Sequence, residues 1–142
     1  MQNNLFTLSF PDENWRDTSV YTFEGPHDSG VQHNLVLVVD NSVPKDAELV
    51  QYAQQQFGRS KEAMPGFELI SEREYQMSSG VPAFEIVYKY SPADTITFFQ
   101  KQVFLIMQGK GYVFTSTFSK KTLQTIAHEV DQIIASFRPL EN

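Results

Sequence analysis

The sequence predicts an α+β domain in which one antiparallel-rich sheet is packed by two main helices. Apolar residues alternate with polar ones in several short segments and recur at steps of three and four in two longer ones. These segments follow one another as strands, a helix, more strands and a closing helix. No repeat, linker or low-complexity stretch divides the chain, so residues 1–142 are predicted to form a single domain.

Three strands are expected before the first helix. Asn4–Phe10, which Pro11 stops, and Ser19–Gly25 are predicted to form an antiparallel pair. Gly25–Gly30 is rich in turn-forming residues and is expected to be a flexible loop. His33–Asp40 is apolar on both faces, which favours a strand in the middle of the sheet that is covered on both sides.

The period then changes from two to that of a helix. Val50, Ala53, Phe57 and Met64 recur at helical spacing, which predicts one helix of about five turns. Pro44 suits an early helical position, and the dipeptide Pro65-Gly66 is expected to end the helix.

A meander of four strands and a second helix complete the predicted fold. The strands are expected at Phe67–Met77, Val81–Tyr90, Asp94–Gln108 and Tyr112–Phe118, with short turns between them. Ser119 is a suitable N-cap for the closing helix, and Pro139 a suitable stop. Its apolar residues lie at steps of three and four: Leu123, Ile126, Ala127, Val130, Ile133, Ile134 and Phe137.

Composition narrows the range of partners and locations. Eleven Lys and Arg against seventeen Asp and Glu give a net charge of −6, and no segment gathers basic residues, so nucleic acid is not expected as a partner. The chain has no cysteine and therefore no disulfide or thiol nucleophile. The N-terminus does not have the pattern of a signal peptide, and the longest near-apolar run, Leu35–Val39, is far below the ~20 residues of a membrane span. We therefore expect a soluble protein without direct membrane insertion, which is compatible with the cytoplasm.

Residue types that carry chemistry are scattered along the chain. His27, His33 and His128 fall on a loop, a strand start and a helix face, without the spacing of a metal site. The tripeptide Gly109-Lys110-Gly111 joins two predicted strands, which favours a hairpin turn over a phosphate-binding loop. We predict no metal, no cofactor and no enzymatic activity.

One predicted strand carries several carboxylates. Glu68, Glu72 and Glu74 alternate with other side chains along it. Spacing alone cannot establish an acid–base pair, so a solvated strand face is the favoured interpretation.

Polar residues also interrupt apolar surfaces. Gln100 and Gln102 lie on the apolar face of one predicted strand, where an unsatisfied buried amide would cost about 1–3 kcal/mol. The alternative is that both amides lie at a solvated edge. On the first helix, Leu49, Tyr52 and Gln56 form a second stripe beside the core stripe. Apolar area with a few amide groups suits the binding of another apolar helix.

The succession of several motifs resembles the DcrB-related domain, and within it the Eag chaperones of type VI secretion. These motifs are W-x-D-x-S-V-Y-T-F at Trp15–Phe23, MPGFEL at Met64–Leu69, G-V-P-A at Gly80–Ala83 and KQVFL at Lys101–Leu105. The resemblance covers nearly the whole chain in the same order of elements.

The resemblance implies a Mog1/PsbP-like α/β sandwich, usually a homodimer, without enzymatic activity or cofactor. Eag-type chaperones hold the N-terminal transmembrane helices of toxic effectors in the cytoplasm before the effectors are loaded on the secretion spike. The expected partner is therefore a type VI secretion effector with N-terminal transmembrane helices.

The resemblance also implies a groove that binds a client helix. Its residues fall here on Val20, Thr22, Gln56, Met64 and Gln102. Thr22 is less apolar than the family pattern implies, which bears on the choice of effector helix. On this interpretation Val20 and Thr22 face the client, while Tyr21 and Phe23 face the core.

Two other functions stay open at this point. One is a Mog1/PsbP-like regulatory or structural module that binds a folded soluble protein. The other is an enzyme that acts through Glu or His residues. A neighbouring gene for an effector with N-terminal apolar helices would favour the chaperone.

Overall fold

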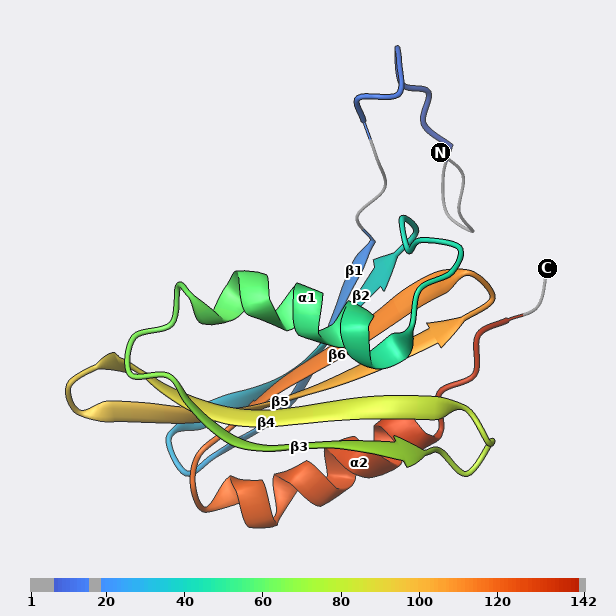
Figure 1. Ribbon diagram of the computed structural model, residues 1–142. Helices are drawn as coiled ribbons and strands as arrows, with labels where there is room; N and C mark the ends of the chain where they lie inside the picture. Colours follow the sequence, from blue (N-terminus) through green and yellow to red (C-terminus); the bar gives the residue numbers. More distant parts are fainter. Residues whose placement is uncertain (1–6, 16–18, 141–142) are drawn as a thin grey trace.

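A computed structural model describes residues 7–15 and 19–140 and shows one antiparallel sheet with a helix on each face (Figure 1). Within these residues the sheet has six strands in the order β1-β2-β6-β5-β4-β3. The strands are β1 (Val20–Asp28), β2 (Val31–Asp40), β3 (Glu68–Gln76), β4 (Pro82–Ala93), β5 (Ile96–Met107) and β6 (Lys110–Phe118). The helices are α1 (Leu49–Lys61) and α2 (Ile126–Ala135), with a short 3₁₀ turn, η1 (Thr122–Gln124), before α2.

The meander from β3 to β6 confirms the four successive strands predicted from the sequence. Each strand pairs antiparallel with the next along the chain. The turn from β5 to β6 consists of Gln108 and Gly109, both at positive φ (53° and 75°), as a tight two-residue hairpin requires. The glycine-containing stretch at this point is therefore a hairpin turn, as predicted.

Each face of the sheet has its own hydrophobic core. On the face that α1 covers, here called the α1 face, Tyr52 and Phe57 pack with Phe84, Ile86 and Phe104. The opposite face, here called the α2 face, carries the larger core. It includes Leu35, Leu37, Val103, Leu105, Phe114 and Phe118 of the sheet and Ala127, Val130 and Ile134 of α2.

Polar contacts also hold the α2 side together. Lys101 Nζ lies 2.9 Å from Asp131 Oδ1 of α2 and 3.4 Å from Glu85 Oε1 of β4. Ser119 Oγ accepts a hydrogen bond from the Thr122 amide at 3.1 Å, although the N-cap residue of η1 is Lys121 and the closing helix α2 begins only at Ile126. The buried ring of His33 bridges β1 and η1, with contacts of 2.9 Å to the Pro26 carbonyl and 2.8 Å to Thr122 Oγ1.

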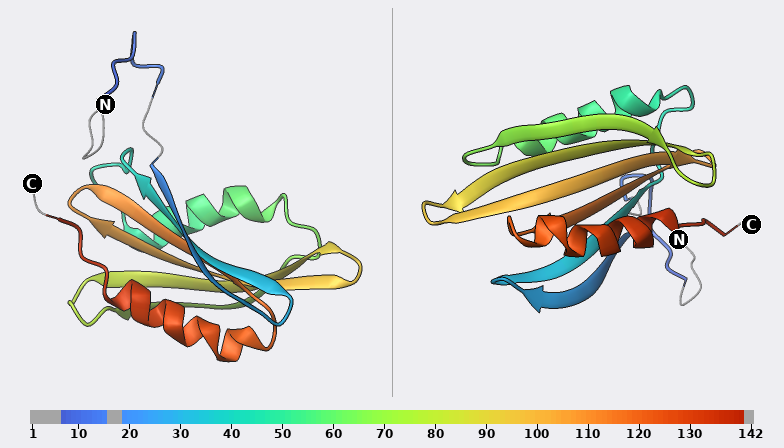
Figure 2. Two further views of the ribbon diagram at one scale, coloured as in Figure 1. Left: turned by 180° about the vertical axis from the view of Figure 1, so that it is seen from behind. Right: turned by 90° about the horizontal axis from the view of Figure 1, so that it is seen from below.

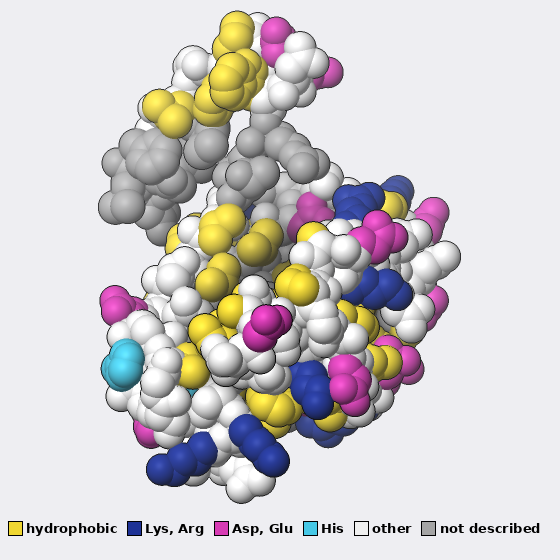
Figure 3. Space-filling model, turned by 90° about the vertical axis from the view of Figure 1, so that its left-hand side faces the viewer, with side chains coloured by type: hydrophobic (Ala, Val, Ile, Leu, Met, Phe, Trp, Pro, Cys, Tyr) yellow, Lys and Arg dark blue, Asp and Glu magenta, His cyan; other side chains and the backbone are white. Residues whose placement is uncertain are grey.

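The start of the chain differs from the prediction. Asn4–Phe6 lie outside the described residues, and of Thr7–Phe10 only Thr7 makes a strand-type bridge. Among the described strands, β1 pairs antiparallel with β2, which follows it in the chain. Thr7–Trp15 project from one end of the sheet and expose the side chains of Leu8, Phe10 and Trp15 (Figures 1 and 3).

The predicted flexible loop at Gly25–Gly30 is mostly strand. β1 continues to Asp28, and the chain reverses only at Ser29 and Gly30, whose φ values are 53° and 79°. A register shift between Glu24 and His27 takes up an extra residue. Pro26 is tolerated here because β1 is an edge strand, where a missing N–H removes no hydrogen bond from the sheet.

The position of one strand and the start of one helix also differ from the prediction. β2 is the second strand from one edge, and β6 and β5 occupy the middle of the sheet. The first helix begins at Leu49 rather than near Pro44, which instead accepts a hydrogen bond from the Ala47 amide in a separate turn. Among the described residues, neither helix is long and apolar enough to cross a membrane.

Candidate functional site

The α1 face of the sheet is apolar beyond the area that α1 covers. Helix α1 packs over β4 and β5, whereas β1 and β2 lie toward the opposite edge of the sheet (Figure 2, right). Residues paired across antiparallel strands point to the same face, so the register defines what remains uncovered. We call this area the open floor; it comprises Val20, Thr22, Val36, Val38 and Thr115, with Gln102 at its border.

Two rows of paired residues cross the open floor. One row joins Thr22, Val36, Thr115 and Gln102 and ends at Ile86 beneath α1. The other joins Val20, Val38 and Val113 and ends at Phe104 beneath α1. The two inner ends belong to the core under α1, whereas Val36 and Val38 belong to neither core and Val20 is 54% exposed.

In the side-chain amide of Gln102, the nitrogen is hydrogen-bonded and the oxygen is not. Its Nε2 donates to Thr115 Oγ1 at 3.1 Å, while its Oε1 is buried and has no hydrogen-bond partner among the described residues. Gln100, two residues earlier on the same face, is fully engaged: it accepts from the Tyr88 hydroxyl at 2.5 Å and donates to Thr117 Oγ1 at 3.0 Å. The contrast leaves a free acceptor at the border of the open floor, next to α1.

Gln56 lies on the side of α1 that faces the open floor. The hydroxyl of Tyr52, one turn earlier, donates to Asp40 Oδ2 of β2 at 2.9 Å, so this stripe of the helix points toward β2. The ring of Phe57 instead packs at a tilt against Phe67 and Tyr88, on the side of β4. Gln56 is half-buried and follows Tyr52 at the i+4 spacing.

Met64 has a different environment from the other four predicted site residues. It is half-buried just beyond the end of α1 and packs against the core under that helix. The structure therefore groups Val20, Thr22 and Gln102 on one face, with Gln56 directed toward it, and places Met64 at the helix end.

The prediction that Tyr21 and Phe23 face the core is wrong. Tyr21 is 50% exposed and Phe23 is 57% exposed, because β1 is an edge strand that no helix covers completely. Their direction is nonetheless opposite to that of Val20 and Thr22, since they pair with Leu37 and Leu35 on the α2 face.

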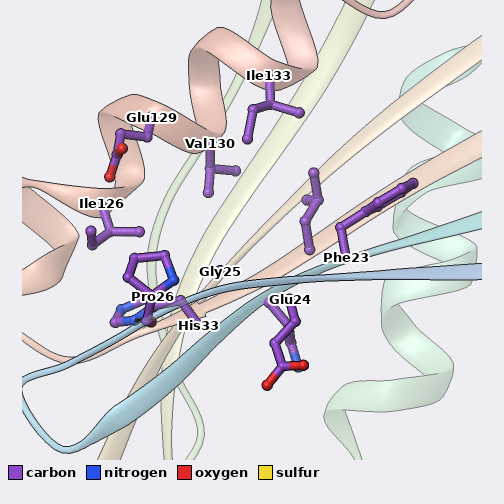
Figure 4. Close-up of a pocket in the computed structure, with 11 residues that line it drawn as sticks. Phe23, Glu24, Gly25, Pro26, His33, Ile126, Glu129, Val130 and Ile133 are labelled. Atoms are coloured by element: carbon purple, nitrogen blue, oxygen red, sulfur yellow. Dashed lines mark hydrogen bonds between the residues drawn. The ribbon is translucent and has the colours of Figure 1, made fainter.

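Phe23 lines a small pocket between β1 and α2. The pocket has a volume of about 120 Å³, and Figure 4 shows Ile126, Val130 and Ile133 of α2 pointing toward the strands across it. In the same view Phe23 points to the α2 side of the ribbon while Glu24 points to the other side. The pocket is mostly apolar and brings together no set of residues suited to catalysis.

Two polar residues of the site were missed from the sequence. Thr115 and Thr117 hold the amides of Gln102 and Gln100, respectively, on the α1 face. The signal was present in the stretch YVFTSTF, where the two threonines alternate with the buried residues Phe114, Ser116 and Phe118. Of the two alternatives left open by the sequence, Gln100 follows the first, because both groups of its amide are hydrogen-bonded within the sheet.

Titratable groups do not gather at the open floor. No group of three or more metal-ligating residues occurs within the described part of the chain. Burial, and then the neighbouring Asp40, raises the pKa of the Tyr52 hydroxyl well above its ordinary value. Burial likewise raises the pKa of Tyr88. Both hydroxyls stay protonated at neutral pH and donate hydrogen bonds, that of Tyr52 to Asp40 and that of Tyr88 to Gln100.

The model of the DcrB family matches residues 6–136. No protein with a curated description matches the sequence.

Several solved structures have a similar fold. A protein of unknown function from Pseudomonas aeruginosa, PA94, suggested to be a regulator, superposes with a TM-score of 0.74 at 22% identity, over 95% of this chain and 92% of that chain. The PsbP protein CyanoP of Synechocystis sp. PCC 6803 gives 0.60 at 15% identity, over 85% and 82% of the two chains.

A third structure is more distant. LpqN of Mycobacterium tuberculosis, which is involved in cell envelope biogenesis, gives 0.50 at 19% identity, over 75% and 62% of the chains. At these identities the likeness shows the fold alone, and it confirms the predicted Mog1/PsbP-like α+β class. None of the three descriptions names an enzymatic activity.

Proposed function

The chain belongs to the DcrB family, and from this membership and the open floor we propose that it is a cytoplasmic chaperone for a type VI secretion effector. It binds the N-terminal transmembrane helices of that effector and shields them from water until the effector is loaded on the secretion spike. The observation that carries the proposal is an apolar sheet face that no element of the described chain covers, beside a helix that can serve as a wall.

The open floor has the chemistry that an apolar helix needs. A transmembrane helix is apolar on all sides and aggregates in water unless its surface is covered. Val20, Val36 and Val38 supply apolar contact on the floor, and α1 borders it. Burying about 400 Å² of apolar surface contributes about 10 kcal/mol at roughly 25 cal/mol per Å², before the cost of association is subtracted.

The amide side chains beside the open floor can orient a bound client helix. The free Oε1 of Gln102 can accept a hydrogen bond from a Ser or Thr hydroxyl of the client. Such small polar residues are common where transmembrane helices pack closely. A client helix that offers a donor at this point would satisfy a buried acceptor that is otherwise left unpaired, which favours one register of the helix over others.

The direct test is co-expression with an effector encoded by a neighbouring gene, followed by co-purification. Val20→Asp places a charge on the open floor at an exposed position, so the fold should persist while client capture falls sharply. Gln102→Ala should weaken capture by about 1 kcal/mol if the amide makes one neutral hydrogen bond.

Ile133→Asp is the matched control, because Ile133 is 53% exposed on α2, on the opposite side of the sheet. This variant should fold and capture the client like the unmodified chain. Equal loss of the client in the Val20 and Ile133 variants would place the client elsewhere. Capture of folded soluble partners, with no preference for apolar helices, would favour the regulatory module instead.

A further inference from the structure

The open floor becomes polar toward one end of its strands. Its two apolar rows begin at Val20 and Thr22 of β1, and two residues further along the strand the pair of Glu24 and Asn34 follows on the same face. Glu24 is exposed and Asn34 is half-buried. Figure 4 shows the Glu24 side chain pointing away from the side of β1 to which Phe23 points, so its carboxylate lies on the α1 face. We call the pair of Glu24 and Asn34 the polar end.

The polar end offers hydrogen-bonding groups that the described chain does not use. Neither Glu24 nor Asn34 makes a side-chain hydrogen bond or ion pair with another described residue. Asp40, two residues beyond Val38 at the other end of the floor, is engaged, because its carboxylate accepts from the Tyr52 hydroxyl at 2.9 Å and from the Ser42 hydroxyl at 2.7 Å. A bound helix therefore meets an available carboxylate at the polar end and an occupied one at the opposite end.

The width of the open floor suits one helix. The floor extends over β1, β2 and β6, which is two strand spacings of about 4.8 Å, or about 10 Å. A helix is about 10 Å across, so one helix can lie along these strands between α1 and the β1 edge. A helix that crossed the strands would meet α1, which packs over β4 and β5. The bound helix therefore has only two orientations, which differ in which of its ends lies at the polar end.

We propose that the polar end binds the basic flank of the client, a Lys or Arg next to its apolar helix, and thereby selects one of the two orientations. This step rests on the proposed function. Transmembrane helices carry an excess of Lys and Arg on their cytoplasmic flank. The apolar stem of such a side chain lies along the floor, while its charged group reaches the Glu24 carboxylate and the side-chain oxygen of Asn34.

The geometry of β1 gives the length of the recognised segment. From Val20 to Glu24 the floor extends about 14 Å, at about 3.4 Å per residue of strand. A helix covers this distance with about nine residues, so the client should be apolar over about the nine residues next to its basic flank. Because Glu24 is exposed, the ion pair should change affinity by about fivefold at most, and its main effect is on orientation.

Reversal of charge tests the pairing of Glu24 with the basic flank. The probe is a helix of about 20 Leu and Ala residues fused to a soluble carrier, with two lysines at one end or two glutamates in their place, co-expressed with the chain. The unmodified chain should co-purify with about three to five times more of the lysine form than of the glutamate form. Glu24→Gln should bring this ratio close to one, and Glu24→Lys should reverse it.

Glu72→Lys is the matched control. Glu72 is also exposed and pairs with Ile86, so it lies on the same face of the sheet, but at the β3 edge. The substitution changes the net charge of the chain by the same amount as Glu24→Lys, and it should leave the preference for the lysine form unchanged. This comparison separates a local ion pair from general attraction by the net charge of −6.

Single cysteines test the orientation of the bound helix. The chain has no cysteine, so Asn34→Cys and Val38→Cys each introduce one thiol, about 14 Å apart along β2. A probe with its own cysteine beside the lysines should form a disulfide with Asn34→Cys and not with Val38→Cys, because a disulfide joins Cα atoms no more than about 7 Å apart. Moving the probe cysteine about 11 residues, or about three turns, along the helix should give the opposite result.

The outcomes separate this inference from the proposed function, because the probe is a model helix and the natural effector is tested separately. Capture of both, with equal amounts of the two probe forms or equal cross-linking at Asn34 and Val38, overturns the role of the polar end and leaves the chaperone function standing. A loss of preference in Glu72→Lys as large as in Glu24→Lys also overturns it. If the charge preference and the Asn34 cross-link are observed but no natural effector is captured, the polar end stands and the chaperone function fails.

Discussion

Tyr52 is the residue that connects α1 to β2, and its hydroxyl makes stability depend on pH. The side chain is buried, and the hydroxyl donates to Asp40 Oδ2 at 2.9 Å. Burial, and then the Asp40 carboxylate, raises the hydroxyl pKa above its ordinary value of 10.0. Because the folded pKa lies above the unfolded one, the associated stability is fully present below pH 10 or so and is lost as the pH rises further.

Replacing Tyr52 by Phe should therefore have two effects. The free energy of unfolding should fall by about 1 kcal/mol at neutral pH, since one hydrogen bond is lost. The decline of stability above about pH 10 should become shallower, because one hydroxyl with a raised pKa is gone. Urea unfolding at several pH values measures both, and an unchanged alkaline slope would contradict the assignment of this titration to Tyr52.

At the residue scale, the alternating directions of the β1 side chains could be predicted from the sequence. Whether another element covers each face of the strand could not. The sequence places Val20 and Thr22 on one face and Tyr21 and Phe23 on the other, as the structure shows. A period of two says nothing about which face another element covers. In β1 neither face is fully covered, which is a property of the edge position and not of these residues.

At the element scale, an ion-pair network fixes α2 to the sheet. Lys101 on β5 is buried and contacts both Asp131 of α2 and Glu85 of β4, while Arg73 of the β3 edge also contacts Glu85 at 2.9 Å. Removing Lys101 leaves the buried Glu85 carboxylate with the exposed Arg73 as its only ion-pair partner in the described chain.

Lys101→Ala should destabilise the protein by about 3 kcal/mol, because a buried charge loses its buried partner. Arg73→Ala should cost less than about 1 kcal/mol, since the Arg73 side chain is 60% exposed and its pair is screened by water. Chemical unfolding of the two variants measures the difference. Equal losses would mean that the network does not fix α2 through Lys101.

Elements with strong local signals were predicted well, and those fixed by tertiary position were not. The β3–β6 meander and the closing helix follow from alternation, helical spacing and turn residues. β2 was misplaced in the middle of the sheet because Val36 and Val38 are as apolar as core residues. Their face is the open floor, and an apolar surface intended for a partner has the same sequence pattern as a buried one.

At the scale of the whole molecule, the two sides of the sheet have different roles. The α2 side is closed by the larger core and by the contacts of Lys101 and His33. The α1 side is closed mainly over β4 and β5, with Val113 of β6 at the margin of its core. One sheet thus provides both the stable core and an uncovered apolar surface. The fold class could therefore be predicted from the sequence, whereas the candidate site could be identified only from the pairing register of the strands.

The strand order also has a consequence for how the chain folds. Along β3-β4-β5-β6 every pairing joins neighbours in sequence, whereas β2 pairs with β6 across the whole intervening chain. Contacts between distant segments carry a larger loop-closure entropy, so the meander should assemble first and the β1–β2 hairpin should join it last.

We expect local unfolding of the native protein to follow the reverse of this order of assembly. The β1–β2 hairpin is expected to separate from β6 as a unit, at a lower free energy than global unfolding. Native-state hydrogen exchange should show the amides of β2 that pair with β6 exchanging faster than those shared by β4 and β5. Equal protection of the two sets would mean that the six strands form one cooperative unit, and a partner held on the hairpin should slow its exchange selectively.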